Sequence, residues 1–488
     1  MCPVISQHAK STSQKRLGAI CNLFACWNLL LGGASAQTWD DAQGNPRWSK
    51  SQNWMGRQAP SNDGLADVFF GFGIHPDIEL DSPWSIHSLT FLPDSGAYRF
   101  YGNALTLQAG GITNLGAPTQ FFTNTLALGQ SQTWNQTGGD ITSFGTVSLG
   151  SSTLTVDGSH NLSLFGSVTG PGSVLKKGSG VLSLSGTNTF SGGIIATQGV
   201  LEFGNNRAAG SGDIRLNNAT LRASINGLTL TNRFFLAGSA TVAGNNSVTL
   251  SGNVVFTADQ TLTVLNSGLT KFTGQIVEQG GAFSFLKQGS GDLEFAGSSS
   301  YSGGTTIDAG TLTLSGNNAL GNTSFLRVNP GATLSLSGTD PINRVRDGAS
   351  FSLNGGTLLG NSHTESFGLL TLEQNSTVAL SPGGLPGTLS FSGGSRTAGT
   401  LTITGWMGSS AGATDDRILF GTAPSGDFLA NVSFSGFAPG AAYLPSGEIV
   451  PVPEPRTVAM LALGLFGFSL RFFQRAARRR CTISCKRL

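Results

Sequence analysis

The sequence predicts an all-β protein built as a solenoid, in which short coils stack and each coil packs on its neighbours. Three observations lead to this prediction. Glycine contributes 70 of the 488 residues, and charged residues make up 11% of the chain against about 25% in average proteins. Short runs that alternate apolar and polar residues recur between Gly, Asn and Ser turns. One stretch of sequence also returns, without a gap, 111 residues later.

The alternating runs indicate short β-strands, because successive side chains of a strand point to opposite faces. Clear examples span residues 104–107, 153–156, 181–184, 311–314 and 333–336. Between Gln37 and Pro453 we find no window of 12 or more residues with the periodicity of an amphipathic helix. A disordered, glycine-rich filler is an alternative, but the regular apolar content argues against it.

The internal repeat decides between a solenoid and other all-β architectures. The segment Leu175–Leu182 returns as Leu286–Leu293, and the glycines that follow match as well. The repeat glycines are Gly178, Gly180, Gly186, Gly192 and Gly193 in the first copy and Gly289, Gly291, Gly297, Gly303 and Gly304 in the second. Leu182, Phe190 and Leu201 are separated by glycine turns, which predicts two or three strands in a coil of about 20 to 25 residues.

These residues resemble the autotransporter-associated β-strand repeat, whose core reads Leu-Lys-x-Gly-x-Gly-x-Leu and continues to an aromatic residue and Gly-Gly. The first copy departs from this pattern at Ile194-Ile195, where the second has Thr305-Thr306. The resemblance implies a single elongated, right-handed parallel β-helix. We expect it to span residues 101–400, with repeat copies near 175–221 and 286–336.

Both ends of the solenoid need caps, because an open terminal coil exposes unpaired strand edges. Residues 37–100 carry four tryptophans and predict an N-terminal cap with the first coils; these are Trp39, Trp48, Trp54 and Trp84. The rings either fill the first coil or form an exposed platform that stacks on sugars, and we favour the first. Residues 401–451 are interpreted as the C-terminal cap.

Residues 1–36 have the pattern of a secretory signal peptide. Lys10, Lys15 and Arg16 precede an apolar stretch, and Ala34-Ser35-Ala36 predicts cleavage before Gln37. A lipoprotein box at Leu23–Cys26 is an alternative, although the apolar residues after Cys26 disfavour it. The expected partners are the Sec translocon and signal peptidase.

Residues 452–488 form a second targeting segment. Val452-Pro453-Glu454-Pro455 precedes an apolar run from Thr457 to Leu470 and a basic end. The basic residues are Arg471, Arg475, Arg478, Arg479 and Arg480. The apolar run is shorter than the roughly 20 residues that span a bilayer comfortably, which suits a transient transmembrane helix.

This order of motif, apolar segment and arginines resembles the PEP-CTERM sorting signal of Gram-negative bacteria. The resemblance implies cleavage at the Pro453-Glu454-Pro455 motif by an exosortase-type membrane enzyme. Until this cleavage, the apolar helix is expected to hold the protein in the membrane. The alternative is an ordinary tail anchor whose arginines follow the positive-inside rule.

Composition excludes several other functions. All five cysteines lie at positions 2, 21, 26, 481 and 485, so residues 37–455 can form neither disulfides nor cysteine–zinc sites. The same residues carry 17 basic and 26 acidic side chains, and this net negative charge argues against nucleic-acid binding.

The search for chemistry leaves few candidates, since a β-helix lyase would need clustered carboxylates with a basic residue. Asp292 with Glu294, and Asp415-Asp416-Arg417, are the carboxylate groups, and we interpret both as solvated turns. The histidines of the body lie apart and show no metal-ligand spacing; these are His75, His87, His160 and His363. Acidic residues between His75 and His87 leave a cation site open, but loop decoration is favoured.

We therefore expect an exported, non-enzymatic structural or adhesive solenoid at the cell surface or in an extracellular matrix. No catalytic residue, metal or cofactor is predicted. Exopolysaccharide is an additional expected partner. The alternative is a secreted β-helix polysaccharide lyase or hydrolase.

Overall fold

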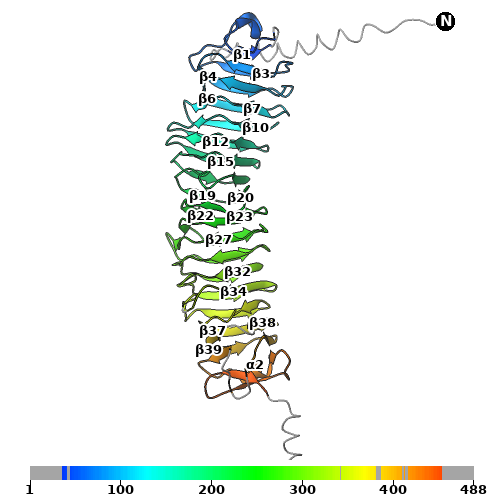
Figure 1. Cartoon of the computed structure of the whole chain (residues 1–488), viewed down its shortest axis with the longest axis vertical. Helices are drawn as coiled ribbons and strands as arrows, with labels where there is room; N and C mark the ends of the chain where they lie inside the picture. Colours follow the sequence, from blue (N-terminus) through cyan, green and yellow to red (C-terminus); the bar gives the residue numbers. More distant parts are fainter. Residues whose placement is uncertain are drawn as a thin grey trace, which may run out of the picture. The chain divides into compact units, whose positions relative to one another are not determined.

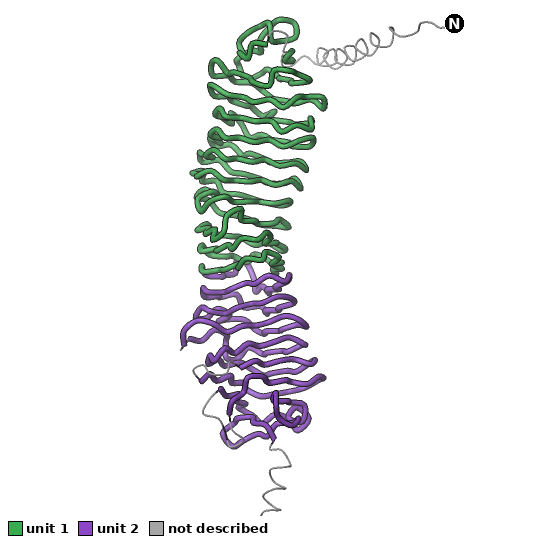
Figure 2. The backbone as a smooth tube through the Cα atoms, turned by 45° about the vertical axis from the view of Figure 1, so that its right-hand side comes forward, with its two compact units in different colours: residues 1–274 green, residues 275–488 purple. Residues whose placement is uncertain are grey.

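The computed structural model describes residues 36–40, 44–340, 342–380, 386–408, 412 and 416–452. The chain divides into two compact units, residues 1–274 and 275–488 (Figure 2). Each is a mostly-β parallel solenoid, and together they hold about 16 turns, which confirms the predicted fold class. The right-handed sense stays a prediction. The helix expected at Thr457–Leu470 lies outside the described residues.

Unit 1 carries three parallel sheets, in which each strand pairs with a strand of the adjacent coil (Figure 1). Sheet 1A contains β1 (Ala36–Trp39), β2 (Asp67–Phe70), β4 (Trp84–Phe91), β6 (Leu105–Asn114), β9 (Gln132–Gln136), β12 (Thr153–Gly158), β15 (Ser173–Lys176), β17 (Ile194–Ala196), β19 (Ile214–Leu216), β22 (Phe234–Leu236) and β25 (Val254–Phe256). Beside it, β6 also pairs with β8 (Leu126–Leu128), and β11 (Val147–Ser148) joins β8 to β14 (Val168–Thr169).

Sheet 1B contains β3 (Asp77–Leu80), β5 (Arg99–Gly102), β7 (Gln120–Phe122), β10 (Ile141–Ser143), β13 (Leu162–Leu164), β16 (Val181–Leu184), β18 (Val200–Phe203), β20 (Ala219–Ala223), β23 (Ser239–Ala243) and β26 (Gln260–Val264). Sheet 1C contains β21 (Leu228–Leu230), β24 (Val248–Leu250) and β27 (Thr270–Phe272). Two 3₁₀ turns, η1 (Ser51–Asn53) and η2 (Met55–Arg57), follow β1.

Unit 2 begins with β28 (Ile276–Glu278) and carries two long parallel sheets. Sheet 2B contains β29 (Phe285–Gln288), β31 (Thr305–Ile307), β33 (Phe325–Val328), β35 (Ser350–Asn354), β37 (Glu365–Gln374), β39 (Thr388–Arg396) and β41 (Arg417–Phe420). Sheet 2C contains β30 (Leu293–Phe295), β32 (Gly310–Leu314), β34 (Ala332–Leu336), β36 (Thr357–Leu359), β38 (Ser376–Ala379), β40 (Leu401–Thr404) and β42 (Val432–Phe434).

The register fixes the length of a coil. Leu162 pairs with Leu182 and Leu182 pairs with Leu201, so these coils are 20 and 19 residues long, close to the predicted length. In the second copy, Leu293 pairs with Leu312 in the same way. Leu182 and Leu201 in the first copy, and Leu293 and Leu312 in the second, are therefore neighbours on adjacent coils with buried side chains.

Alternation along each strand sends one set of side chains into the coil and the other outward. In unit 2 the interior includes a stack of four phenylalanines from successive coils: Phe351, Phe367, Phe391 and Phe420, with ring centroids 4.9 to 5.4 Å apart. Such rings bury large apolar areas and align because parallel strands repeat in register.

The last coil of unit 2 ends in a short helix and a hairpin. The helix α2 (Gly426–Ala430) is capped by Ser425, whose hydroxyl accepts a hydrogen bond from the Phe428 N–H at 3.1 Å. Phe428 is buried against Phe420 with ring centroids 5.6 Å apart. Strands β43 (Ala441–Tyr443) and β44 (Ile449–Pro451) pair antiparallel and close the described part of the unit.

Candidate functional site

The repeat glycines all lie between strands, where adjacent coils come closest. A Cβ atom on Gly186 would overlap the carbonyl oxygen of Gly166, one coil away, and a Cβ on Gly166 would overlap that of Gly145. Gly193 adopts φ 81°, a conformation that residues with side chains rarely adopt. Glycine at these positions therefore lets the turns of adjacent coils lie close together.

Two buried lysines occupy the same position in the two copies of the repeat, and the sequence pattern predicted no role for them. Lys176 donates its ammonium to the carbonyl oxygen of Gly178. Lys287 donates to the carbonyls of Gly289 at 3.0 Å and Ala309 at 2.8 Å. Both side chains are at most 1% exposed. The sequence contains an indication of this burial. Each lysine lies two residues after an apolar residue that is buried, so alternation along the strand points its side chain into the coil as well.

Burial lowers the pKa of each lysine to about 8, and a nearby carboxylate, Asp157 or Asp292, offsets only part of the effect. The backbone carbonyls supply the hydrogen bonds that a buried ammonium requires. The two lysines therefore tie the glycine turn to the strand from inside the coil.

The four tryptophans of the N-terminal region lie in the interior. Trp48 and Trp54 are fully buried with ring centroids 4.9 Å apart, and the Trp54 indole N–H donates to the Trp48 carbonyl at 2.8 Å. Trp39 packs edge-on against Trp54 at 5.1 Å, and Trp84 is 8% exposed. Rings in this position fill the first coils and do not face solvent as a sugar platform would.

The predicted carboxylate pairs do not come together as a catalytic cluster. Asp292 is exposed, and Glu294 on the outer face of β30 accepts a hydrogen bond from Ser315. The interpretation of Asp416 as part of a solvated turn was wrong, since it is 5% exposed and accepts a hydrogen bond from the Gly387 N–H at 2.6 Å. This hydrogen-bond donor lies 29 residues away in the chain, so the local sequence does not reveal the contact. Asp415 lies outside the described residues.

The histidines are likewise separate. His87 Nδ1 lies 2.7 Å from Asp67, which also accepts a hydrogen bond from Ser88. His160 Nδ1 lies 3.3 Å from the hydroxyl of Ser159. Within the described ranges, no group of three or more His, Cys, Asp or Glu side chains is placed to hold a metal ion.

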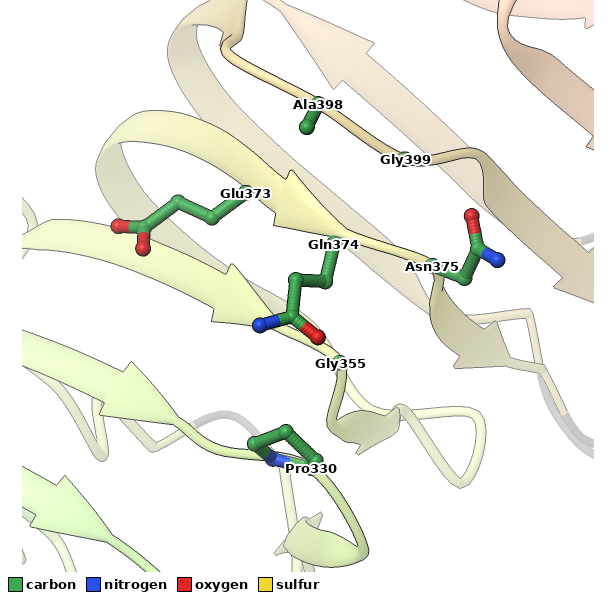
Figure 3. Close-up of a pocket in the computed structure, with 7 residues that line it drawn as sticks. All are labelled: Pro330, Gly355, Glu373, Gln374, Asn375, Ala398 and Gly399. Carbon is green, nitrogen blue, oxygen red and sulfur yellow. The ribbon is translucent and has the colours of Figure 1, made fainter.

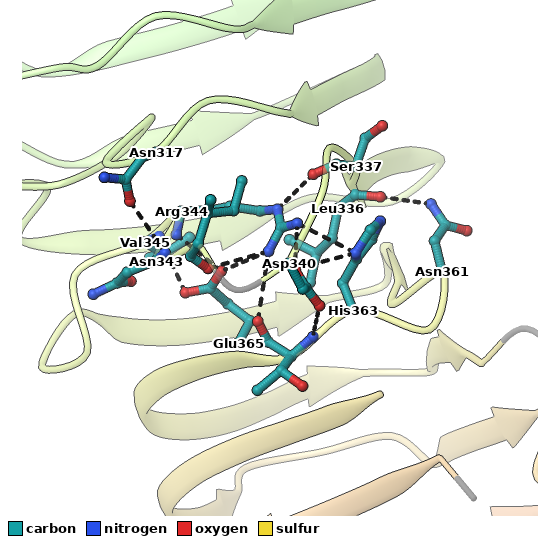
Figure 4. A network of polar contacts seen from close by, with 12 residues as sticks. Asn317, Leu336, Ser337, Asp340, Asn343, Arg344, Val345, Asn361, His363 and Glu365 are labelled. Carbon is teal, nitrogen blue, oxygen red and sulfur yellow. Dashed lines mark hydrogen bonds and ion pairs between the residues drawn. The ribbon is translucent and has the colours of Figure 1, made fainter. Parts of the chain in front are cut away.

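A buried arginine organises the most extensive charged network in the described part of unit 2 (Figure 4). Arg344 is fully buried and donates to Asp340 at 2.8 Å and to the Ser337 carbonyl at 2.6 Å. Its guanidinium lies 3.6 Å from Glu365, which accepts the backbone N–H groups of Arg344 and Val345.

Burial raises the pKa of Glu365 to about 7, although these N–H donors and the guanidinium act in the opposite direction. Inside the coil, the guanidinium of Arg344 is paired with the carboxylates of Asp340 and Glu365. This network therefore joins the loop before β35 to the start of β37 and offers no free group to a ligand.

The surface of unit 2 also holds a shallow depression of about 380 Å³ beside the end of β37 (Figure 3). It is lined by Pro330, Gly355, Glu373, Gln374, Asn375, Ala398 and Gly399. No residue of this depression was singled out from the sequence, because its lining comes from the strand ends and turns of four successive coils.

The targeting segments are described only at their inner edges. Ala36 and Gln37 begin β1, and Val452 follows β44. Ala34, the Pro453-Glu454-Pro455 motif and the arginines from Arg471 to Arg480 lie outside the described residues. No helix in the part of the chain that the structure describes is long and apolar enough to cross a membrane.

Comparison with known families identifies both sequence patterns. The passenger-associated-transport-repeat model matches residues 174–203, 285–314 and 308–323. The PEP-CTERM protein-sorting motif matches residues 451–480.

A curated relative, the adhesin BmaC autotransporter of Brucella suis biovar 1 (strain 1330), is 35% identical over 170 residues. The matched segment is 34% of this chain and 5% of that protein, so the chain spans only a small part of the relative's length. No solved structure matches the chain. The chain is thus an exported β-solenoid protein that carries passenger-associated transport repeats and a PEP-CTERM protein-sorting motif, which implies processing by an exosortase.

Proposed function

We propose that this protein is a non-enzymatic structural and adhesive solenoid, displayed on the cell surface or held in an extracellular matrix. The repeats and the similarity to an autotransporter adhesin support this proposal. A right-handed coil sense and an extended body are part of the same proposal, since presentation of many weak contacts benefits from length.

The observation that carries the proposal is a column of hydroxyl side chains on the outer face of sheet 2C. Five half-buried threonines pair with one another from coil to coil and are followed by a serine: Thr311, Thr333, Thr357, Thr377, Thr402 and Ser433. Parallel strands repeat every 4.7–4.9 Å or so, so the column offers the same neutral group at a constant spacing. A surface of this kind suits multivalent attachment, in which weak contacts add.

Delivery completes the proposal. The Sec translocon exports the chain, signal peptidase cleaves between Ala36 and Gln37, and the Thr457–Leu470 segment holds the protein in the inner membrane with the arginines on the cytoplasmic side. An exosortase-type enzyme then cleaves at Pro453-Glu454-Pro455 and releases the solenoid to the cell exterior, where exopolysaccharide is the expected partner.

The test combines processing and attachment in the producing cell. We expect the native protein to lose both end segments in an intact-mass measurement and to fractionate with the surface or the matrix. Replacing Pro453, Glu454 and Pro455 by alanine should retain the full C-terminal mass in the inner membrane. Deletion of the gene should weaken cell attachment or matrix cohesion.

Attachment unchanged by the deletion would overturn the adhesive role. Incubation with acidic and neutral polysaccharides tests the enzymatic alternative. Calcium-dependent release of unsaturated or reducing ends would overturn the non-enzymatic proposal.

A further inference from the structure

We propose that the depression in unit 2 is a binding site for a neutral oligosaccharide. This inference rests on the proposed adhesive function and goes beyond it by naming a site and the chemistry of its ligand. The depression lies beside the end of β37 (Figure 3), where the pairing of β37 with β35 is irregular.

A β-bulge shapes the site. Leu353 pairs with Leu372 but Asn354 pairs with Gln374, so Glu373 is an extra residue in β37. Bulges redirect side chains and end regular pairing, and they are common beside functional sites. Here the bulge turns Glu373 toward Arg327, two coils away, where the two form a bidentate ion pair at 2.6 and 2.9 Å.

Two glycines in the left-handed region line the depression. Gly355 has φ 87°, and a Cβ there would lie 3.0 Å from the Pro330 ring and 3.4 Å from the Gln374 amide oxygen. Gly399 has φ 79°, and a Cβ there would overlap the backbone of Gln374. A side chain at Gly355 would enter the space beside Pro330 and Gln374, whereas glycine at position 399 lets this turn lie close to the backbone of the neighbouring coil.

A column of four amide side chains and one carboxylate leads into the depression along sheet 2B. The column consists of Gln288, Asp308, Asn329, Asn354 and Gln374. Asn329 donates to Asp308 at 3.0 Å and Asn354 donates to Asn329 at 3.0 Å, so the inner members are mutually bonded. Gln374 is exposed, and its amide makes no hydrogen bond within the described part of the chain. Asn375 accepts the Thr400 N–H at 2.9 Å and keeps its amide N–H₂ for a ligand.

The charges around the depression favour a neutral ligand. Ser352 donates to Glu373 at 2.7 Å; although burial acts in the opposite direction, this hydrogen bond and the Arg327 guanidinium lower the Glu373 pKa below its usual value. Arg396 donates to the Gly399 carbonyl at 2.7 Å and pairs with Asp427 at 2.9 Å. Each bordering charge already has an opposite partner, so neither an anion nor a cation gains a free counter-charge.

Sugar chemistry fits the groups that remain. A sugar hydroxyl both donates and accepts, as does a carboxamide, and the two can form paired hydrogen bonds. The Pro330 ring and the exposed Ala398 methyl provide apolar contact for the C–H face of a sugar ring. The volume of about 380 Å³ falls at the lower end of the range of about 300–1,000 Å³ typical of small-ligand sites.

The test uses the full-length chain purified in detergent and titrated calorimetrically with hexasaccharides of β-1,4-glucan, β-1,3-glucan and β-1,4-mannan. Hexagalacturonate serves as the anionic comparison. We expect at least one neutral hexasaccharide to bind. Gln374→Ala should raise its Kd about tenfold, the loss of one to two hydrogen bonds. Ala398→Arg should abolish binding by filling the depression. Gln288→Ala, at the far end of the same column, should change the Kd by less than about twofold.

Binding of hexagalacturonate alone, absence of binding by every neutral hexasaccharide, or equal effects of Gln374→Ala and Gln288→Ala would each overturn the inference. Circular-dichroism melting of every variant confirms that the fold is intact. If cells still need the protein for attachment while no saccharide binds, this inference fails and the proposed function stands. If attachment does not need the protein, the proposed function fails regardless of the titration.

Discussion

The two repeat copies, one in each unit, share a buried lysine but differ at a buried aromatic position. Lys176 and Lys287 are both buried and both bind turn carbonyls. At the aromatic position the first copy has Phe190 and the second Tyr301, and both side chains are fully buried. The Tyr301 hydroxyl lies 2.7 Å from Thr305 Oγ1, whereas the first copy has Ile194 in place of that threonine.

The comparison shows that the aromatic position and the position four residues after it differ together between the two copies. A buried phenolic hydroxyl needs a hydrogen-bond partner, and Thr305, itself 2.9 Å from the hydroxyl of Thr323, supplies one. Phenylalanine needs none, so isoleucine fills the same space in the first copy. The lysine does not vary between the copies because its partners are backbone carbonyls, which both copies contain. We therefore expect the departure at Ile194 to be coupled to the exchange of tyrosine for phenylalanine at position 190.

The largest expected effect concerns a feature that both copies share. Gly199 and Gly310 have φ 73° and 64°, and a Cβ on either would strike the carbonyl of Gly178 or Gly291. We expect Gly199→Ala and Gly310→Ala each to lower the free energy of unfolding by about 3 kcal/mol. Urea unfolding followed by circular dichroism measures this. Gly348→Ala, at a site with open space, is the control. An effect confined to one copy would contradict the equivalence of the two.

The second prediction reproduces the exchange between the copies. Phe190→Tyr should destabilise the first copy by about 2 kcal/mol, because it buries a hydroxyl beside Ile194. Adding Ile194→Thr should restore about half of the loss. Tyr301→Phe with Thr305→Ile should be better tolerated than Thr305→Ile alone. Double-mutant cycles from unfolding curves give the coupling energies. Additive effects in both copies would show that the exchange is not coupled.

The third prediction uses the shared lysines. The folded pKa of about 8 lies below the ordinary lysine value near 10.4, so the unfolded chain binds more protons between these values. The free energy of unfolding should therefore rise as the pH increases from 8 to 10.5, by about 1–2 kcal/mol for each lysine.

Guanidinium unfolding at several pH values tests this rise. The Lys176→Met/Lys287→Met variant should lose it, while Lys177→Met, at an exposed neighbour, should keep it. A rise that persists in the double variant would assign it to other groups.

The smallest effect is expected on the outer face. Ile195 is 43% exposed and corresponds to Thr306 in the second copy. Ile195→Thr should change the free energy of unfolding by less than about 0.5 kcal/mol, since an outward side chain on this strand has little to lose. Thermal melting beside the wild type measures it. A decrease in the free energy of unfolding comparable to that of Phe190→Tyr would mean that residues on the outer face are also coupled to the aromatic position.

Much of the fold could be predicted because its rules are local. Alternation along short strands fixes which side chains face inward, and the spacing of Leu182 and Leu201 fixes the coil length. The glycine positions and the sorting motif are readable for the same reason, since each depends on a few consecutive residues.

Other features depend on which residues the neighbouring coil places beside a given side chain. Asp416 is buried by a partner 29 residues away, and Tyr301 and Thr305 meet Thr323 only after a coil has closed. The depression joins four coils, and the Arg327–Glu373 pair spans 46 residues.

The sequence by itself therefore determined the class of fold, its period and its C-terminal sorting motif, because these follow from local alternation, turn chemistry and a short residue pattern. Only the tertiary structure decided which polar groups are buried, which of them pair and where the surface is hollowed. Those outcomes follow from the exact stacking of successive coils, and a shift of one residue in register would rearrange all of them.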